Sequence, residues 1–331
     1  MAPLRRRVRK SRVEGTRLFF ATDIHGSDRC FRKFLNAAAF YRCDVIVMGG
    51  DMTGKMLVPI VPVGGGTYRT TLFGRERLVT DEALPALRKQ ITDAGYYAYD
   101  TTAEEIDALE GDQDAVDQVF WRVIGETVER WLRLAEERLA GTEVMCVMAP
   151  GNDDPPFVDR LLRTSSRVIN PERQVVELPG GFPMISVGYS NPTPWDSPRE
   201  VPEEQLLAMI EDEAGKLDGG DLALAVFNLH VPPKDSGLDT AVLLDDELRP
   251  VTRSGSPVFA GVGSTAVRES IERRQPMLGL HGHIHESRGE ARVGRTLSLN
   301  PGSEYSEGVL RGVIVTLSPK KGVKGFQLVA G

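Results

Sequence analysis

Five short apolar runs in this 331-residue sequence each lead into a polar cluster that carries Asp, Asn or His. Runs of this length are typical of buried strands, and in open α/β sheets ligands collect beyond the carboxyl ends of the strands. The histidines are not scattered over the chain, because every one of them lies in these clusters. The sequence therefore predicts an α/β fold with potential metal ligands gathered at one edge. The histidines are His25, His230, His281, His283 and His285.

The first two clusters belong to a β-α-β unit that places Asp23 and Asp51 at the tips of neighbouring strands. A helix capped by Ser27 or Asp28 is expected between the two strands. The pattern of a strand followed by a polar cluster then recurs along the chain. The expected strands cover residues 18–22, 44–48, 144–149, 184–187, 222–229, 277–280 and 309–317, and the expected helices cover about 28–40, 203–216 and 265–274.

About a hundred residues separate the second cluster from the third, more than one crossover helix requires. Segment 55–141 is therefore expected as an insertion in a single domain over 17–331, and a lid or a dimer surface are both open as its role. Its apolar residues at helical spacing are expected to face a core, with a partner-binding face as the alternative. The expected elements are a hairpin (58–63 and 68–73), a helix (80–94) and a long amphipathic helix (112–140).

The composition argues against several classes of protein. A net charge of −7 and a pI near 5.4 disfavour stable nucleic-acid binding, because such affinity comes from clustered Lys and Arg. The three cysteines form no CxxC pair, which fits a reducing cytoplasm, and no apolar run approaches the roughly 20 residues that span a bilayer. Residues 1–16 are expected as a solvated basic tail, with a tethering arm as the alternative. A homo-oligomer stays open.

The mixture of carboxylate, amide and imidazole groups predicts which metals the clusters would bind. Such ligands suit Mn, Fe, Zn or Co, with Mn and Fe favoured, whereas Ca would prefer oxygen alone. Two ions about 3.5–4 Å apart need a bridging carboxylate and several terminal ligands. A single tetrahedral zinc would leave half of the groups unused. We therefore expect two divalent ions per chain, with a mononuclear zinc hydrolase as the alternative.

Each motif is weak alone, but their ordered combination is specific. Through this combination the sequence resembles the calcineurin-like metallophosphoesterase family over about residues 17–318. The resemblance implies a sandwich of two mixed β-sheets flanked by helices. The motifs that carry it are Asp23-Ile24-His25, Gly50-Asp51, Gly151-Asn152-Asp153-Asp154, His230 and Gly282-His283-Ile284-His285.

The resemblance also implies a role for each ligand residue and a reaction. Hydrolysis of a phosphoester would proceed by in-line attack of a metal-bridging hydroxide, and Asn152 would additionally orient the phosphoryl group. A small phosphodiester, such as a cyclic nucleotide, is preferred over a monoester as substrate. Asp23, His25 and His285 would hold the first metal, Asn152, His230 and His283 the second, and Asp51 would bridge them.

One departure from the family pattern affects the mechanism. Asp153 stands where the family usually has a histidine that assists the leaving group, and an ordinary aspartate is ionised at pH 7 and repels phosphate. Burial could raise the pKa of Asp153 so that it acts as the acid, His281 could reach in, or the substrate could need little protonation. For His281 a contact to a ligand or substrate, a structural role and metal ligation are all open. Asp28 and Asp154 are explained by capping or turn support at least as well as by catalysis.

Two loops are candidates for substrate selection. Trp195 offers an indole for stacking on a base, although a Pro-rich turn anchored by a buried Trp is the favoured interpretation. Lys234 is either a phosphate contact or a surface lysine. The competing class is a non-catalytic binding module on the same fold, in which Asp153 marks decayed chemistry. Retention of all seven predicted ligands argues against that class, and a phosphomonoesterase is the nearer alternative.

Overall fold

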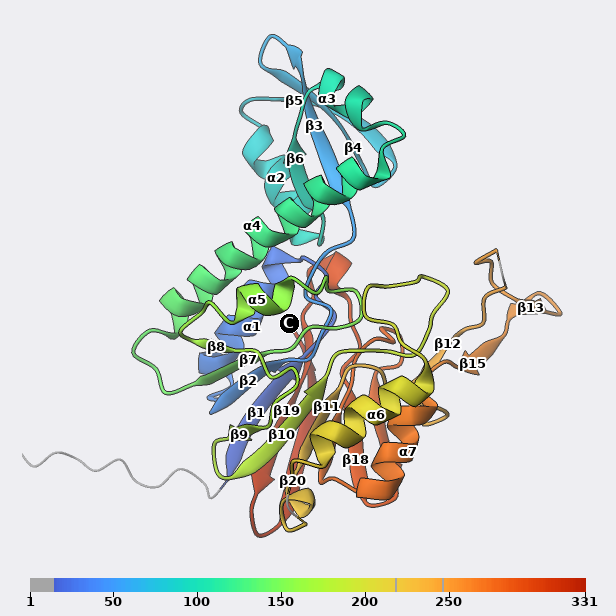
Figure 1. Cartoon of the computed structure of the whole chain (residues 1–331). Coiled ribbons are helices and arrows are strands. Elements are labelled where there is room, and N and C mark those ends of the chain that lie inside the picture. The colour runs from blue at the N-terminus through green and yellow to red at the C-terminus, as the bar shows by residue number, and fades with distance from the viewer. Residues whose placement is uncertain (1–14, 218, 246) are drawn as a thin grey trace, which may run out of the picture.

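Two six-stranded mixed sheets pack face to face in the computed structural model, which describes residues 15–217, 219–245 and 247–331 (Figure 1). Side chains of both sheets share one buried core, among them Leu18 and Val47 from the first sheet and Met184 and Leu299 from the second. The sandwich that the resemblance implied is confirmed. The first sheet has the order β20 (Gly322–Ala330), β19 (Arg311–Ser318), β1 (Thr16–Ala21), β2 (Val45–Met48), β7 (Met145–Met148), β8 (Val168–Ile169). The second has the order β17 (Gly289–Val293), β18 (Thr296–Asn300), β16 (Leu278–Leu280), β11 (Val226–Leu229), β10 (Phe182–Val187), β9 (Val176–Leu178).

The central strands are apolar along their length because both of their faces are buried. In β1, Leu18 and Phe20 face the second sheet, whereas Phe19 and Ala21 belong to the core beneath the outer helices. Strands β1, β2 and β7 are parallel to one another, and so are β10, β11, β16 and β18. The carboxyl ends within each set therefore share one edge of their sheet.

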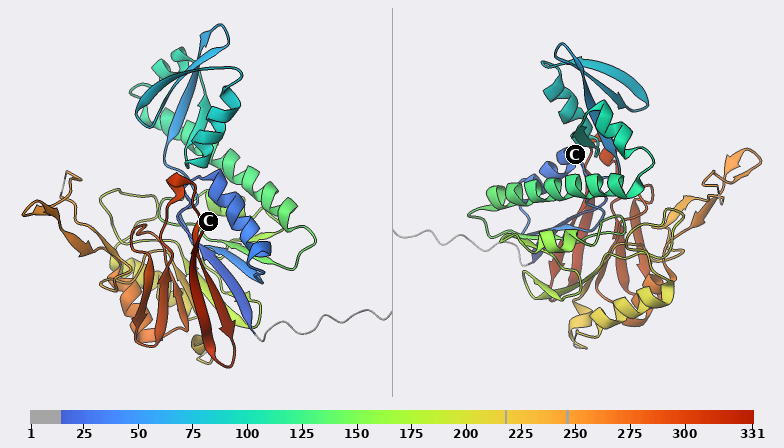
Figure 2. Two further views of the ribbon diagram at one scale, coloured as in Figure 1. Left: turned by 180° about the vertical axis from the view of Figure 1, so that it is seen from behind. Right: turned by 45° about the horizontal axis from the view of Figure 1, so that its top comes forward.

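Helices cover the outer face of both sheets (Figure 2). Ser27, one of the two expected caps, begins α1 by accepting a hydrogen bond from the backbone N–H of Cys30 at 3.3 Å. The four helices expected over 28–40, 112–140, 203–216 and 265–274 are confirmed to within two residues. On the first sheet lie α1 (Asp28–Phe40), α4 (Gln113–Leu139) and α5 (Val158–Leu162), and on the second lie α6 (Glu203–Ala214) and α7 (Thr265–Arg274).

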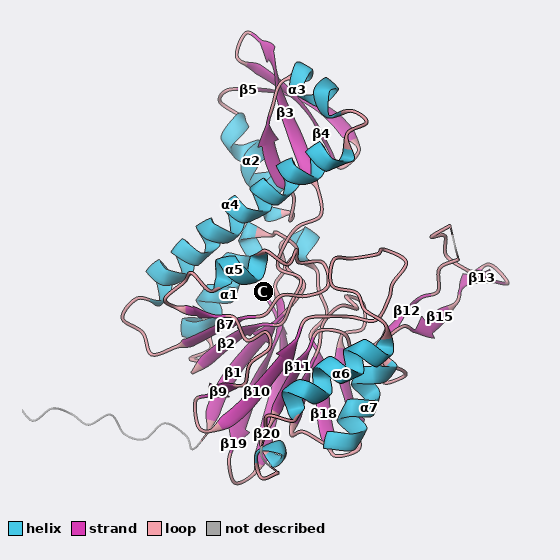
Figure 3. Cartoon of the chain, in the orientation of Figure 1, coloured by secondary structure: helices cyan, strands magenta, loops and turns pink. Residues whose placement is uncertain are grey.

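The segment between β2 and α4 forms a small lobe that stands clear of the sandwich (Figure 3). Its four strands follow the order β5-β4-β3-β6, and Val58, Leu72 and Ile91 belong to a core of its own. The expected hairpin is confirmed as β3 and β4, but the expected helix over 80–94 begins only at Leu84, because residues up to Thr80 pair in β5. The elements are β3 (Leu57–Gly64), β4 (Thr67–Leu72), β5 (Arg75–Thr80), α2 (Leu84–Asp93), β6 (Tyr97–Asp100) and α3 (Ala103–Leu109).

A second projection, the arm, leaves the sandwich between β11 and α7 (Figure 2). It consists of two short antiparallel pairs and was not expected from the sequence. The strand expected over 222–229 is shorter than expected, because a hydrogen bond from Leu224 N to the Asp221 carbonyl closes a turn of 3₁₀-helix before β11. The arm contains β12 (Thr240–Val242), β13 (Thr252–Arg253), β14 (Ser256–Pro257) and β15 (Phe259–Gly261), and the 3₁₀ turns are Asp221–Ala223 and Tyr305–Glu307.

Two sequence expectations concern the ends and the surface of the chain. Most of the expected basic tail, residues 1–16, lies outside the described residues, and Thr16 already pairs with Leu317 in the first sheet. Across the described ranges, no helix combines the length and the apolar character that crossing a lipid bilayer requires.

Candidate metal centre

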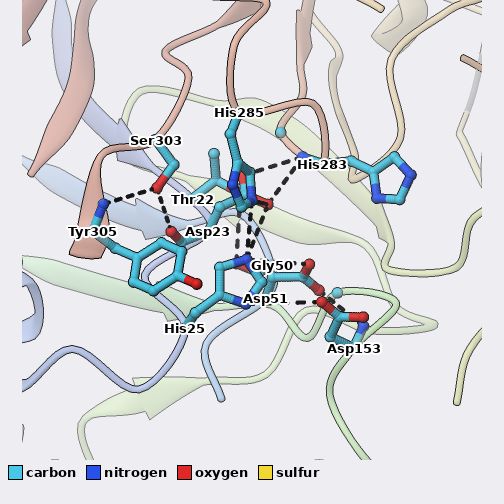
Figure 4. A network of polar contacts seen from close by, with 12 residues as sticks. Thr22, Asp23, His25, Gly50, Asp51, Asp153, His283, His285, Ser303 and Tyr305 are labelled. Atoms are coloured by element: carbon cyan, nitrogen blue, oxygen red, sulfur yellow. Dashed lines mark hydrogen bonds and ion pairs between the residues drawn. The ribbon is translucent and has the colours of Figure 1, made fainter. Parts of the chain in front are cut away.

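The five polar clusters meet at one end of the sandwich, in the loops that follow β1, β2, β7, β11 and β16. Figure 4 shows residues from the loops that follow β1, β2, β7 and β16. Among the described residues, three groups of three side chains have potential ligand atoms within 4.8 Å of one another, and the third group, His25, Asp51 and Asp153, shares residues with the other two. The other two groups each combine residues that follow strands of the first sheet with residues that follow strands of the second, so the site joins the two halves of the sandwich. The first group is Asp23, His25 and His285, and the second is Asp51, His230 and His283.

The first group gathers two imidazoles around one carboxylate. The Nε2 atoms of His25 and His285 are 3.0 Å apart, and Oδ1 of Asp23 lies 3.5 Å from the His285 nitrogen and 4.0 Å from the His25 nitrogen. Burial, followed by the charge of His285, holds the pKa of His25 well below its usual range. A neutral imidazole has a free lone pair, which is the form that binds a metal.

The second group includes the carboxylate that lies between both groups. Oδ1 of Asp51 is 3.4 Å from Nε2 of His230, and Oδ2 of Asp51 is 3.8 Å from Nε2 of His25. Asn152 joins this group through its Oδ1, which lies 2.8 Å from Nδ1 of His283. All seven predicted ligand residues are therefore brought together, and Asp51 has one oxygen toward each group.

The electrostatics of the cluster fit divalent cations. Burial, followed by the charge of Asp153, raises the pKa of Asp51 to about 7, because negative charge is crowded in a region with little water. Nε2 of His230 and Nδ1 of His25 are buried and have no hydrogen-bond partner among the described residues. Buried polar atoms without partners are costly. Bound cations would offset the negative charge of the buried carboxylates. Ring nitrogens without a hydrogen-bond partner could serve as ligands of such cations.

The backbone at the strand tips has an unusual conformation. Asp23, His25, Asp51 and His283 have φ values of 54°, 38°, 49° and 65°. Side-chain-bearing residues adopt this left-handed region at a cost of roughly 1–2 kcal/mol each. Strain of this kind concentrates at functional sites, where the surrounding structure holds it in place.

Two motif glycines allow the loops to approach one another. A Cβ atom on Gly151 would lie 2.2 Å from Oδ1 of Asp51, and one on Gly282 would lie 2.3 Å from Oδ2 of Asp23. Either contact would be a severe clash. The Gly-Asn-Asp-Asp and Gly-His-x-His patterns therefore require glycine because a carboxylate of the site packs against the backbone at these positions.

Asp154 and Asn300 support the loops and do not face the ligand groups. The Asp154 carboxylate accepts hydrogen bonds from the backbone N–H groups of Met52, Thr53 and Gly151, which ties the second loop to the third. The Asn300 amide donates to the carbonyl oxygen of Ile284 at 3.0 Å. The turn-support explanation of Asp154 agrees with these contacts.

Asp153 does not have the raised pKa that would let it act as an acid. Burial opposes its ionisation, but the neighbouring Lys55 and His25 hold the pKa of this carboxyl well below its usual range. Its Oδ2 forms an ion pair with Nζ of Lys55, and its Oδ1 accepts a hydrogen bond from Ser197 Oγ at 2.7 Å. Of the three alternatives left open for leaving-group assistance, a protonated Asp153 disagrees with this lowered pKa. Lys55 is a cavity residue that the motifs did not indicate.

His281 points away from the ligand groups. Its Nδ1 lies 2.8 Å from the Leu229 carbonyl oxygen and its Nε2 lies 3.3 Å from Ser298 Oγ, so both ring nitrogens have partners inside the protein. Burial lowers its pKa to about 4. The expectation that His281 shares a side with His283 fails because β16 ends at Leu280 and the alternation of a strand no longer applies. A catalytic role of His281 disagrees with this placement, and the structural alternative agrees with it.

A cavity of about 620 Å³ opens over the ligand groups. Asp51, Asn152 and His283 line it together with Lys55 and Asp153. The remainder of its wall comes from the loop 191–195, from Lys234 and from the arm. Trp195 is 62% exposed, so the favoured interpretation of a buried Trp in this loop is wrong.

Comparisons with known proteins agree with this architecture. No family model matches the sequence. The chain is 29% identical to the uncharacterized protein MJ1162 of Methanocaldococcus jannaschii over 179 residues, which are 53% of this chain and 69% of that protein. The crystal structure of TT1561 of Thermus thermophilus aligns with 96% of this chain and 98% of that one, at a TM-score of 0.52 and 12% identity. A second solved structure aligns with 95% of this chain and 98% of that one, at a TM-score of 0.53 and 17% identity.

The two packed mixed sheets, shared with TT1561, carry the polar clusters of the signature at one edge. The chain has the calcineurin-like metallophosphoesterase fold. In this metallophosphoesterase fold the lobe over β3–α3 and the arm over β12–β15 are the segments that project from the sandwich (Figure 1).

Proposed function

We propose that this chain is a divalent-metal-dependent phosphoesterase that hydrolyses small phosphodiesters. The observation that carries the proposal is the position of Asp51 between two groups of ligand side chains, at the base of a cavity large enough for a small molecule. Paired metal sites of this composition are used to hydrolyse phosphate esters.

The ligand roles follow from the two groups. Bound ions would neutralise phosphate charge and lower the pKa of a water molecule, which is the chemistry that a protein of this kind needs. Manganese and iron suit the mixture of oxygen and imidazole ligands. Asp23, His25 and His285 would hold one ion, Asn152, His230 and His283 the other, and Asp51 would bind both.

The remaining polar groups would handle the substrate. The Asn152 amide lies in the cavity wall with its Oδ1 beside His283. Its Nδ2 donates one N–H to Asp153 Oδ1 at 3.3 Å, which leaves the second N–H as a donor for a phosphoryl oxygen. Lys55 would place its ammonium group near the oxygen of the departing alcohol. Once Lys55 turns from Asp153 to the substrate, the charge of Asp153 would favour diesters, because a diester carries one negative charge and is repelled less than a doubly charged monoester.

The test combines bound metal with turnover. We expect about two ions per chain, and Mn-dependent hydrolysis of bis(p-nitrophenyl) phosphate that exceeds hydrolysis of p-nitrophenyl phosphate. We expect Asp51→Asn to lower kcat/KM by on the order of 100-fold or more and to reduce bound metal. Asp153→Asn should cost less, because Asp153, although it lies in a third group with His25 and Asp51, is paired with Lys55 and is not one of the seven proposed metal ligands.

Other outcomes would each contradict a specific part of the proposal. Equal losses in the two variants, or a larger loss in Asp153→Asn, would refute the role of Asp51. Fewer than one ion per chain under saturating conditions would refute the pair of metals. Two bound ions without turnover of either ester would favour a binding module.

A further inference from the structure

The loop 191–195 presents its aromatic side chain to the cavity from a braced backbone. Trp195 is 62% exposed although Trp is among the most apolar side chains, and it lines the cavity. Its backbone N–H donates to Thr193 Oγ1 at 3.1 Å, and Thr193 N–H donates to the Glu200 carboxylate at 2.8 Å. The indole is therefore held in solvent by an ordered loop.

The same loop is tied to the proposed metal centre. Ser197 Oγ donates to the Asp153 carboxylate at 2.7 Å, and the backbone N–H of Arg199 donates to the carbonyl oxygen of Asn152 at 3.0 Å. The side chain of Arg199 is buried and donates to the Asp154 carbonyl oxygen at 2.7 Å. These contacts fix the distance between the indole and the residues that would hold the phosphate.

Asn191 adds an unmatched acceptor to the cavity wall. Its amide oxygen is buried and has no hydrogen-bond partner among the described residues. The residue lines the same cavity as Trp195. If the Asn191 side chain turns toward the cavity, an N–H group of a ligand would satisfy this oxygen, whereas a purely apolar ligand would leave it unsatisfied.

The arm supplies an apolar surface that a phosphate alone does not need. Val242, Leu244 and Val262 line the cavity, which at about 620 Å³ lies in the range of sites for small organic molecules. A substrate that fills this space must have a sizeable group besides its phosphate. That group must be able to stack on an aromatic ring and to donate a hydrogen bond to an acceptor.

Resting on the proposed function, we propose that this part of the cavity binds the base of a nucleoside phosphoester. The base stacks on Trp195, and an N–H group at its edge donates to the Asn191 oxygen. A nucleobase combines a planar apolar face with polar N–H edges, which matches the two features that the loop presents. The phosphate then lies on the side of Asn152 and Lys55.

The test measures binding, and turnover is followed separately. Isothermal titration compares AMP, GMP, CMP and UMP with ribose 5-phosphate, which has the same sugar and phosphate but no base, on the Mn-loaded protein. We expect at least one nucleotide to bind about 10-fold or more tightly than ribose 5-phosphate. Trp195→Ala should weaken the binding of that nucleotide by about 5- to 100-fold and leave the binding of ribose 5-phosphate unchanged. Trp195→Phe should retain most of the affinity of the wild type for the nucleotide. Asn191→Ala should weaken the binding of the nucleotide by a smaller factor than Trp195→Ala does.

Trp121→Ala is the matched control, because Trp121 is 50% exposed on α4 and does not line the cavity. The inference is overturned if the four nucleotides bind no more tightly than ribose 5-phosphate, or if Trp195→Ala leaves their binding unchanged. If phosphodiesters are hydrolysed although binding does not depend on the base or on Trp195, the proposed function stands and the base site is refuted. Base-dependent binding without any turnover would retain the base site and refute the esterase.

Discussion

Lys55 and Asp153 form an ion pair in the wall of the cavity, and Asp153 stands where the family that the sequence resembles would be expected to have a histidine. An aspartate alone would repel the phosphate, whereas the pair is neutral and keeps a cationic donor beside the ligand groups. The Lys55 side chain is 54% exposed, so it can turn toward a substrate without losing a buried contact. A cation near the departing oxygen stabilises the charge that develops on it.

We expect Lys55→Ala to lower kcat/KM by roughly 10- to 100-fold for diesters, and by more when the leaving alcohol is a poor one. The reason is that poor leaving groups carry more negative charge in the transition state. The measurement is kcat/KM for a series of aryl and alkyl diesters whose alcohols differ in pKa. Lys55→Arg should retain most of the activity, because it keeps the charge.

Lys234→Ala serves as the control for Lys55, because Lys234 also lines the cavity but donates its ammonium group to the Gly261 carbonyl oxygen at 2.9 Å. Any loss of kcat/KM in Lys234→Ala should be the same for every leaving alcohol. A Lys55→Ala variant whose loss is the same for every alcohol would assign Lys55 to substrate binding alone. Bound metal should be unchanged in both variants.

At this scale the ligand residues could be predicted and their neighbours could not. Asp23, Asp51 and His283 lie in motifs whose glycine and carboxylate spacing is imposed by close packing of the loops. Lys55 lies in no motif, since its role depends on the direction of a long flexible side chain. His281 was misjudged because its ring direction depends on where β16 ends.

Asp28 connects two helices that position the first ligand loop. It is the first residue of α1, directly after that loop, and its carboxylate accepts hydrogen bonds from Arg130 Nη1 at 2.7 Å and from Trp131 Nε1 at 2.6 Å on α4. Trp131 also stacks on Phe31, with ring centroids 4.4 Å apart. The long helix that leads out of the lobe is thereby fastened to the sandwich beside the site.

We expect Asp28→Ala to destabilise the protein by about 2–4 kcal/mol, because it leaves a buried indole N–H without a partner and removes a charge-assisted hydrogen bond. Urea unfolding of the metal-loaded protein measures this loss. Trp131→Phe should cost less, since it keeps the ring stacking and removes only the donor. Turnover by the folded fraction should stay near wild type, and a large fall in kcat at unchanged stability would assign Asp28 to catalysis.

Elements with a buried face could be predicted, and exposed elements could not. The helices α1, α4, α6 and α7 each show an apolar stripe in the sequence because each packs on a sheet. Strand β5 has no fully buried residue, so its sequence shows no alternation of apolar and polar side chains. Strand β20, at the edge of the first sheet, also has no fully buried residue, although Phe326 and Leu328 pack against the shared core.

The stability of the whole molecule depends on a buried carboxyl group remote from the ligand residues. Burial raises the pKa of Glu172 to about 7 from an ordinary value of 4.5, and the nearby Arg199 offsets only part of this effect. Its Oε2 accepts a hydrogen bond from the backbone N–H of Gly188 at 3.0 Å, whereas its Oε1 has no partner among the described residues. The folded protein thus prefers a protonated Glu172.

We expect the free energy of unfolding to fall as the pH rises from about 4.5 to 7, as far as Glu172 determines it. Over this interval the folded state keeps the proton that the unfolded state has lost, and stability falls with pH wherever the folded state binds more protons. Glu172→Gln removes this dependence and should stabilise the protein by roughly 1–3 kcal/mol above pH 7. Below about pH 5 the variant and the wild type should be nearly equal. A difference that is the same at all pH values would refute this explanation.

The left-handed backbone at Asp23, His25, Asp51 and His283 has a consequence for how such a protein changes over generations. Glycine adopts these φ values without steric cost, so a change to glycine at any of these tips would abolish a ligand and relieve strain in the same step. A substitution that removes the proposed reaction would then stabilise the metal-free folded chain. The Asp23 and Asp51 carboxylates also accept hydrogen bonds from the backbone N–H groups of His283 and Asp153, so under the proposed function these strained positions would serve both the loops and the bound ions.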